Sequence, residues 1–210
     1  LARLRMATRD RSIETLIQRL NRLPGVGPKT AERLAFHLLR VDEDEALALA
    51  RAIEAVRAQV KTCSVCCQLD AQDPCSVCSD ETRDRSMLLV LEDPREVARF
   101  EDVGYRGLYH VLQGRLSQVE GIRPEDLTTE RLLERVQQGA FAEICFATNP
   151  DLEGEATARV LAERLSNRGG EGTVRITRLA RGLPAGASIA QVSSSILADA
   201  IEGRRPLTGT

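Results

Sequence analysis

The hydrophobic positions between residues 12 and 40 repeat with the period of an α-helix. The positions that follow the i, i+3, i+4, i+7 spacing are Ile13, Leu16, Ile17 and Leu20, and then Ala31, Leu34, Ala35 and Leu38. This spacing predicts two amphipathic helices that each bury one face. Ser12 precedes the first set and is expected to cap that helix.

Further along the chain, hydrophobic residues form a continuous run at residues 87–91, and further runs lie at residues 143–147 and 173–179. Runs of this length predict buried strands. A helical stripe follows the second run, with Ala156, Val160, Leu161 and Leu165 on one face. Strands that alternate with helices predict an α/β fold with a mostly parallel sheet, whose site lies at the carboxyl ends of the strands.

The segment between the two N-terminal helices has the composition of a phosphate-binding hairpin. Gly25 and Gly27 permit a tight turn and a close backbone approach, and Pro28 suits the first turn of the second helix. Backbone N–H groups at the start of that helix can hold a phosphate oxygen, with Lys29 and Arg33 one turn apart beside it. We therefore predict a DNA-binding helix-hairpin-helix that does not read base sequence. The alternative is a hairpin whose glycines serve packing only.

The charge of the 210-residue chain is nearly balanced, with a net value of −2, but it is unevenly distributed. Residues 1–40 hold nine lysines and arginines against three acidic residues, so the rest of the chain is net acidic. A basic N-terminal part favours a polyanionic partner for that part alone. The sequence has no hydrophobic run that could span a bilayer, and its arginine-rich start lacks the apolar region of a signal peptide. We expect a cytoplasmic protein.

Four cysteines form two Cys-x2-Cys pairs within the stretch CSVCCQLDAQDPCSVC. Cys63 and Cys66 make the first pair, and Cys75 and Cys78 make the second. Two such pairs can present four thiolates in a tetrahedron, which is the closed geometry of a structural zinc site. The spacing therefore predicts one structural Zn²⁺ per chain, with no open position for a substrate.

The alternatives for these cysteines are a pair of disulfides or a redox motif. Either one needs an oxidising compartment or a thioredoxin-like strand–helix setting, and the sequence indicates neither. Cys67 adjoins a ligand and is expected to be a bystander, although it could take the place of a ligand. Cys145 lies within a hydrophobic run and is expected in the core.

Acidic residues cluster where the first two predicted strands end. Glu92 follows the run at 87–91, and Asp151, Glu153 and Glu155 follow the run at 143–147. Carboxylates that meet at such an edge can hold Mg²⁺ for phosphoryl chemistry. The acids that precede or begin a helix also have a structural explanation, because acidic residues stabilise a helix N-terminus.

This layout resembles the Toprim domain of topoisomerases, primases and some nucleases. That family has an acidic residue after its first strand and an Asp-x-Asp after a later strand. Asn149 stands in place of the first of these aspartates, which leaves Asp151 alone. A neutral amide binds a hard dication poorly, and no tyrosine lies in a nucleophile context, since Tyr105 and Tyr109 are expected to pack. We therefore expect the sheet to serve as a binding platform.

The order of the predicted modules resembles the RecR family of bacterial recombination mediators. The matching stretches cover nearly the whole chain: LPGVGPKTAERLAFHLL, the cysteine segment with DPCSVC, YRGLYHVL, ATNPDLEGEATA, RGLPAG and EGRR. Asn149 agrees with this family, whose members usually lack the full Asp-x-Asp. The C-terminal part departs from it, because AQVSS at residues 190–194 stands where the family usually has an acidic-aromatic run.

The resemblance implies a DNA-repair factor without enzymatic activity. Proteins of this kind assemble as dimers or tetramers that form a ring or clamp on DNA, act with RecO and RecF, and help to load RecA onto gapped or single-stranded DNA. On this basis Lys29 and Arg33 face double- or single-stranded DNA, and the protein is associated with the nucleoid. The acids of the sheet edge then contact partner proteins; they are Glu92, Asp151, Glu153 and Glu155.

Four modules are expected: a helix-hairpin-helix region at residues 1–60, a four-cysteine zinc finger at 61–82, a Toprim-like domain at 83–184 and a C-terminal helical segment at 185–210.

The alternative function is a Mg²⁺-dependent Toprim enzyme, either a nuclease or a nucleotidyl-transfer protein, that uses Glu92, Asp151 and Glu155. A zinc-bearing sequence-specific regulator is a third hypothesis, although no base-reading helix stands out.

Overall fold

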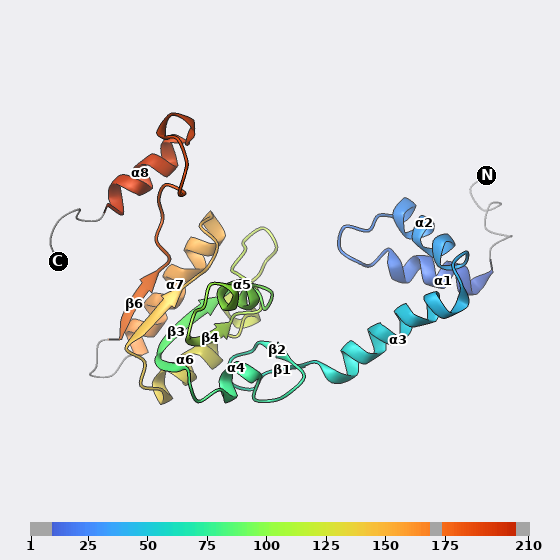
Figure 1. The fold of residues 1–210 in the computed structure, drawn as a ribbon, viewed down its shortest axis with the longest axis horizontal. Helices are drawn as coiled ribbons and strands as arrows, with labels where there is room; N and C mark the ends of the chain where they lie inside the picture. Colours follow the sequence, from blue (N-terminus) through green and yellow to red (C-terminus); the bar gives the residue numbers. More distant parts are fainter. Residues whose placement is uncertain (1–9, 169–173, 205–210) are drawn as a thin grey trace. The chain divides into compact units, whose positions relative to one another are not determined.

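The computed structural model describes residues 10–168 and 174–204, and the chain divides after Val60 into two compact units (Figure 1). Predictions that involve residues 1–9, 169–173 or 205–210 lie outside the described residues. They include the contribution of the first three arginines to the basic N-terminal part and the start of the third strand at Thr173.

The first unit consists of three helices: α1 (Arg11–Leu20), α2 (Pro28–Leu38) and α3 (Glu43–Gln59). The two amphipathic helices predicted from the sequence are α1 and α2, and Pro28 is the first residue of α2 as expected. The prediction that Ser12 caps α1 is wrong. Asp10 is the cap, because its carboxylate accepts a hydrogen bond of 2.8 Å from the Ser12 N–H and satisfies a free donor of the first turn.

Small residues form the centre of the first unit. Ala31 and Ala35 of α2 are fully buried and lie one turn apart on the same face of the helix. Helices α1 and α3 bury none of their residues completely. The first unit therefore has only a very small core of its own, and much of its hydrophobic surface stays exposed.

The second unit contains a four-stranded parallel sheet with the strand order β4–β3–β5–β6. Its elements in chain order are β1 (Lys61–Thr62), β2 (Leu69–Asp70), α4 (Ser76–Ser79), β3 (Asp84–Leu91), α5 (Glu96–Asp102), β4 (Gly107–Val111), the 3-10 turn Pro124–Asp126, α6 (Thr129–Gln138), β5 (Glu143–Phe146), α7 (Leu152–Arg168), β6 (Arg175–Arg178), the 3-10 turn Ile189–Gln191 and α8 (Ser194–Glu202). The pattern had predicted β3, β5 and β6. Strand β4 is new, because the segment YRGLYH was expected only to pack, and all five of its strand residues are buried.

Alternate residues of β3 face opposite sides of the sheet. Leu88 and Val90 belong to a cluster that also contains Leu132 of α6 and Leu161 of α7. The other face is lined by a second cluster, whose members include Leu89, Leu91, Tyr109 and Val111 of the sheet, Val97 of α5 and Cys67 of the cysteine segment. Helices therefore cover both faces, as the α/β class requires for a parallel sheet.

The strand order also determines where a site can form. The chain leaves β3 toward β4 on one side and later returns to place β5 on the other side of β3. Connections that leave two neighbouring parallel strands in opposite directions open a crevice at the carboxyl ends of those strands. The residues that follow β3 and β5 are Glu92 and the segment around Asn149, so the sequence-predicted acids lie at this crevice.

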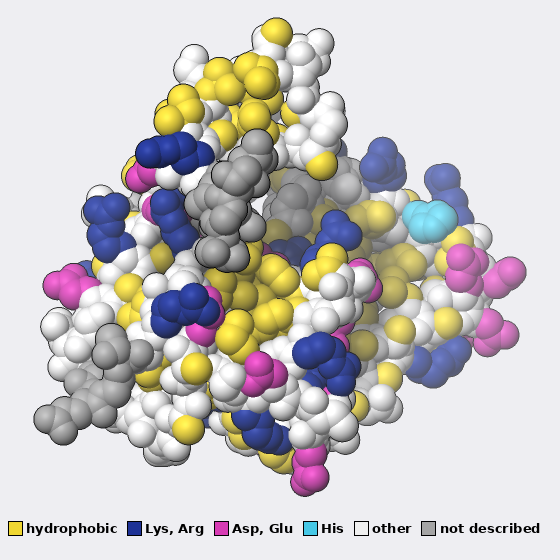
Figure 2. Space-filling view, turned by 60° about the vertical axis from the view of Figure 1, so that its left-hand side comes forward, with side chains coloured by type: hydrophobic (Ala, Val, Ile, Leu, Met, Phe, Trp, Pro, Cys, Tyr) yellow, Lys and Arg dark blue, Asp and Glu magenta, His cyan; other side chains and the backbone are white. Residues whose placement is uncertain are grey.

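Helix α8 confirms the predicted helical C-terminal segment, and the Ser193 hydroxyl caps it by accepting a hydrogen bond from the Ile196 N–H. It buries no residue completely, and Ile201 of this helix and Ile189 of the preceding 3-10 turn are each 66% exposed. On the face of the molecule drawn in Figure 2, hydrophobic side chains gather at the top. Within the described part of the chain, no helix combines the length and the apolar character needed to cross a membrane. The proposed boundaries of the four modules stay predictions.

Candidate functional site

The hairpin between α1 and α2 has one glycine that its backbone needs and one that it does not. Gly25 has a φ of +76°, a left-handed conformation that favours glycine. Gly27 has an ordinary φ of −79° where it precedes α2. A Cβ atom added at either glycine would meet no described atom within 4 Å. Packing inside the described chain therefore does not explain Gly27, whereas a molecule that approaches the backbone from outside would.

The two basic side chains predicted for this hairpin are available to an anion. Lys29 and Arg33 lie in the first two turns of α2, and both are exposed. Neither has a carboxylate within 4 Å among the residues that the structure describes. The first N–H groups of α2 also have no side-chain cap, so backbone donors and two cations lie at the same helix end.

The four predicted cysteine ligands converge. The sulfur atoms of Cys63, Cys66, Cys75 and Cys78 all lie within 4.8 Å of one another, and the Cys66 and Cys75 sulfurs are 3.4 Å apart. A tetrahedral zinc site with Zn–S bonds of about 2.3 Å has sulfur–sulfur edges of about 3.8 Å. The hydrogen bond to Cys75, helped by burial, raises the pKa of the Cys66 thiol well above its usual range. Four cysteine sulfurs this close together could hold a metal ion, whose binding would displace the thiol protons.

Backbone hydrogen bonds prepare the same sulfur cluster. The Cys63 sulfur accepts from the N–H groups of Val65 at 3.4 Å and Cys75 at 3.3 Å. Cys67 does not belong to the cluster. It has a φ of +64°, and its side chain packs against the sheet with Leu89 and Tyr109. Cys67 is therefore a core residue that anchors the cysteine segment to the sheet. A hydrogen bond of 2.8 Å from the Val111 N–H to the Cys66 carbonyl anchors the same segment.

The crevice at the sheet edge contains a buried carboxylate that an amide residue satisfies. Glu92 is only 5% exposed. Its two oxygens accept hydrogen bonds from the backbone N–H of Asn149 at 2.9 Å and from the Asn149 side-chain amide at 2.6 Å. Asn149 therefore acts as a hydrogen-bond donor to Glu92. An ionised aspartate at this position could not donate and would repel the Glu92 carboxylate.

The missing side chain of Gly154 leaves room for the contact between Glu92 and Asn149. A Cβ atom at Gly154, in the first turn of α7, would lie 2.1 Å from the Asn149 carbonyl oxygen and 2.8 Å from a Glu92 carboxylate oxygen. Any other residue at this position would push the helix away from the two polar groups. The glycine is thus a packing requirement of the crevice.

Arginines neutralise the acids that surround the crevice. Arg115 forms ion pairs with Asp151 and, at 3.0 Å, with Glu153. Glu155 pairs with Arg178 and Arg181. A hydrogen bond from the Gly154 N–H, and then Arg115, hold the pKa of Asp151 below its usual range. The acids that sequence analysis brought together are thus close to one another, but their charges are already compensated.

The two tyrosines are too buried, and their phenolate forms too unfavourable, to suit a nucleophile. Tyr109 is 1% exposed, and its hydroxyl donates to a Glu101 carboxylate oxygen at 2.6 Å. Burial raises the pKa of Tyr105 to about 12, which makes its reactive phenolate form rarer. Both side chains pack beneath the sheet, as the sequence predicted.

Comparison with known proteins decides the family. A model described as RecR, helix-hairpin-helix matches residues 13–57, and a Toprim domain model matches residues 86–180. A protein named recombination protein RecR from Rhodopirellula baltica is 49% identical over 197 residues, which is 93% of this chain and 97% of that protein. The chain belongs to the RecR family.

Other RecR proteins match over the same extent. The relative from Heliobacterium modesticaldum is 48% identical over 193 residues, 91% of this chain and 95% of its own. The relative from Rubrobacter xylanophilus is 45% identical over 203 residues, 96% of this chain and 100% of its own. The resemblance to the RecR family that was inferred from the sequence is therefore confirmed.

Sequence reasoning missed the residues that satisfy the acids. Arg115 follows β4, whereas Arg178 and Arg181 lie at and just after the end of β6, and no local motif connects them to Asp151 or Glu155. Gly154 did carry a signal, because a glycine inside a helical pattern often marks a close approach. The donor role of Asn149 could not be recognised without the position of Glu92.

A substitution at Asn149 tests whether the crevice depends on its amide. Asn149→Asp should lower the free energy of unfolding by about 1–3 kcal/mol at pH 7, because two carboxylates would meet in a buried place. Their mutual repulsion raises a carboxyl pKa in the folded state, so the loss should shrink as the pH falls toward about 4. Chemical denaturation at several pH values measures this, with the exposed Asn167→Asp as the matched control. Equal stability of both variants at pH 7 would contradict the assignment.

Neighbouring cysteines test the metal centre. Cys66→Ala should reduce the bound zinc of the purified protein to near zero, because three sulfurs no longer close the tetrahedron. Cys67→Ala should keep about one zinc per chain, since its side chain lies in the core. Elemental analysis of the two proteins gives the answer, and zinc retained in Cys66→Ala would show that the cluster is not the metal centre.

Proposed function

We propose that this RecR-family chain is a DNA-binding recombination mediator in DNA repair. It acts as an oligomeric ring or clamp on DNA and works with RecO and RecF to load RecA on gapped or single-stranded DNA. It has no catalytic activity of its own, and it operates in the cytoplasm at the nucleoid. The following observations support this proposal.

The hairpin provides the main support. Gly27 has no structural need inside the described chain to be glycine. Lys29 and Arg33 extend from the same helix end and have no carboxylate within 4 Å among the described residues. Phosphate contacts from backbone N–H groups and two cations would hold DNA of any sequence. We assign DNA contact to Gly25, Gly27, Lys29 and Arg33 on this basis.

The condition of the sheet edge supports a non-enzymatic role. A Mg²⁺-dependent Toprim enzyme would need Glu92, Asp151 and Glu155 free to approach a dication and its bound phosphates. Here Asn149 donates a hydrogen bond to each Glu92 oxygen, and arginines pair with the other two acids. We assign partner contact to the ion pairs of Asp151, which is exposed, and of Glu153 and Glu155, which are half-buried. Glu92 is instead assigned a positioning role, because its burial keeps it from a partner surface.

The third helix supports self-assembly. Leu49, Ile53, Val56 and Val60 follow alternating spacings of four and three residues along and just after α3, so they lie on one stripe. All four are exposed, Ile53 and Val56 at 58% each. A hydrophobic stripe of this length is costly in water and is suited to the same stripe of a second copy. A ring would then present several hairpins to one DNA molecule and gain avidity.

The metal has a structural role in this proposal. Zinc held by Cys63, Cys66, Cys75 and Cys78 would keep the cysteine segment folded against β4, and it would bring no catalytic chemistry because all four positions are sulfur. Removal of the metal should therefore destabilise the second unit and leave the charge of the hairpin unchanged.

Two substitutions in the hairpin test the DNA assignment. Lys29→Ala with Arg33→Ala should weaken binding of labelled duplex DNA by about tenfold or more and reduce the slope of log affinity against log salt by about 1.8, since two phosphate contacts are lost. Fluorescence anisotropy over a salt series measures both. Bound zinc and thermal unfolding should match those of the unchanged protein, and unaltered affinity would refute the role of the hairpin.

Charge placed on the α3 stripe tests assembly. Ile53→Glu with Val56→Glu should shift the protein to a smaller species in sedimentation velocity, because four carboxylates would meet at a two-fold interface. Ala58→Glu, on the opposite side of the same helix, should leave the distribution unchanged. An unshifted distribution for the double variant would remove this stripe from the interface.

A further inference from the structure

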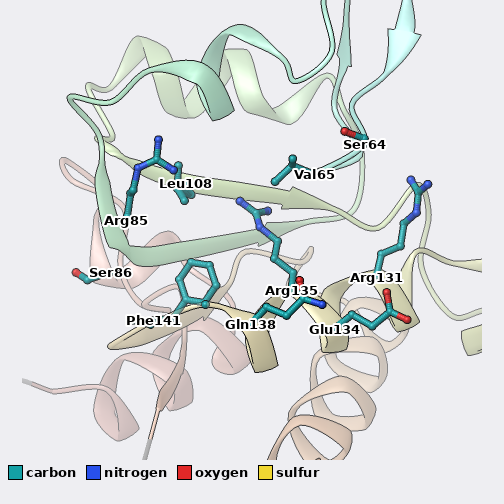
Figure 3. Close-up of a pocket in the computed structure, with 12 residues that line it drawn as sticks. Ser64, Val65, Arg85, Ser86, Leu108, Arg131, Glu134, Arg135, Gln138 and Phe141 are labelled. Atoms are coloured by element: carbon teal, nitrogen blue, oxygen red, sulfur yellow. The ribbon is translucent and has the colours of Figure 1, made fainter.

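A pocket of about 650 Å³ lies at the amino ends of the sheet strands, far along β3 from the acidic crevice (Figure 3). Its walls come from three elements of the second unit. Val65 lies between the first two cysteines, Arg85 is the second residue of β3, and Arg131 and Arg135 lie on α6. Phe141, just before β5, also lines the pocket. Its volume is typical of a site for a small ligand or a segment of a chain.

The three arginines of this pocket differ from most others in the second unit. Most arginines there have a carboxylate partner, as Arg115 and Arg178 do. Arg85, Arg131 and Arg135 have none within 4 Å among residues 10–168 and 174–204. The structure therefore concentrates uncompensated positive charge in a concave place, where a low-dielectric wall strengthens its field.

Neutral acceptors hold these guanidinium groups in position. Arg85 donates to the Cys78 carbonyl at 3.4 Å, Arg131 donates to the Cys67 sulfur at 3.5 Å, and Arg135 donates to the Tyr109 carbonyl. Each guanidinium carries five N–H donors, so most of its donors remain free. The groups are therefore pre-oriented without being neutralised.

The other titratable groups nearby do not cancel this charge. Glu134 is the one acid among the residues that line the pocket, so the lining keeps a net positive charge of two. Burial, and after it the charge of Arg135, lower the pKa of His110 to about 3. This imidazole is neutral at physiological pH and contributes no charge of its own.

The arrangement of the arginines indicates the shape of the ligand. Figure 3 shows the Arg135 guanidinium in the middle of the pocket, with Arg85 and Arg131 on opposite sides of it. The Arg135 guanidinium also lies over the Phe141 ring, 5.9 Å from its centre. A row of cations fits a chain with an anion at every unit, and a planar guanidinium supported by an aromatic ring can stack on a base.

We infer that this pocket binds a short segment of single-stranded nucleic acid through successive phosphates, independently of the hairpin. The regularly spaced phosphates of single-stranded DNA can pair with the row of three arginines, whereas a peptide would need acidic side chains at matching intervals. A duplex is too wide and too stiff to enter a cavity of this size. This inference rests on the proposed function, because it supplies that function with a second DNA contact specific for single strands.

The test uses the full chain with its hairpin disabled by Lys29→Ala and Arg33→Ala. In this protein, a fluorescein-labelled ten-residue oligo-dT should still bind in an anisotropy titration. Adding Arg85→Glu and Arg131→Glu should weaken that binding by about tenfold or more and lower the salt slope by about 1.4, the value for two single-strand phosphate contacts. Both side chains are exposed, so zinc content and thermal unfolding should not change.

A matched control separates the pocket from general charge. Arg99→Glu with Arg159→Glu changes the net charge equally at two exposed positions outside the pocket, and it should leave oligo-dT affinity within about twofold. Equal losses in both double variants, or no loss in either, would overturn the inference. Pocket-dependent binding of a labelled ten-residue poly-glutamate peptide in place of oligo-dT would overturn it in favour of an acidic peptide.

The two proposals fail in different ways. If the hairpin substitutions do not weaken duplex binding, the proposed function loses its DNA contact while the pocket can still bind oligo-dT. If oligo-dT affinity is unaffected by the pocket substitutions, the pocket inference fails and the hairpin assignment stands.

Discussion

Glu92 is a carboxylate buried at the end of the central strand β3, and the sheet edge is organised around the need to satisfy it. An isolated buried charge is very unfavourable. Asn149 supplies two donors to it, and Gly154 leaves the room that this contact requires. Arg115 lies close enough for its pKa to be raised by the charge of Glu92 as well as by Asp151. An edge that could hold a dication in a Toprim enzyme is here stabilised by the protein's own donors and cations.

The two ends of the sheet differ in how their charges are compensated. The carboxyl ends of the strands carry acids that are paired with arginines. At the amino ends, Arg85, Arg131 and Arg135 have no carboxylate partner among the residues that the structure describes. The cysteine segment lies between β4 and this basic pocket, because Cys67 packs into the core and Val65 lines the pocket wall. Metal binding by its four sulfurs therefore also fixes one wall of the pocket.

Much of the fold follows from the sequence. The helical period identified α1 and α2, the hydrophobic runs identified three of the four parallel strands, and the cysteine spacing identified the sulfur cluster. Strand β4 was missed because its five residues include Gly107 and two aromatic or imidazole side chains, so no simple hydrophobic run marks it. The sequence pattern predicted Ser12 as the cap of α1, and the structure has Asp10 there; both residue types cap helices well, so residue type alone does not distinguish them.

The candidate site was less predictable than the fold, for a physical reason. Local patterns show which acids stand at strand ends, but charge compensation depends on residues that are distant in sequence. Arg115 follows β4 and Arg178 ends β6, and only the packed sheet brings them to Asp151 and Glu155. The same holds for the basic pocket, whose arginines come from β3 and α6.

We infer that the sheet edge is a platform whose charges are compensated within the protein and that it does not hold a metal. Isothermal titration of the full chain with Mn²⁺, a Mg²⁺ analogue with favourable binding heat, tests it most directly, with Glu92→Gln as the comparison. We expect no saturable binding that differs between the two proteins at millimolar Mn²⁺. One-to-one binding that disappears in Glu92→Gln would contradict it and restore a metal-dependent role for this edge.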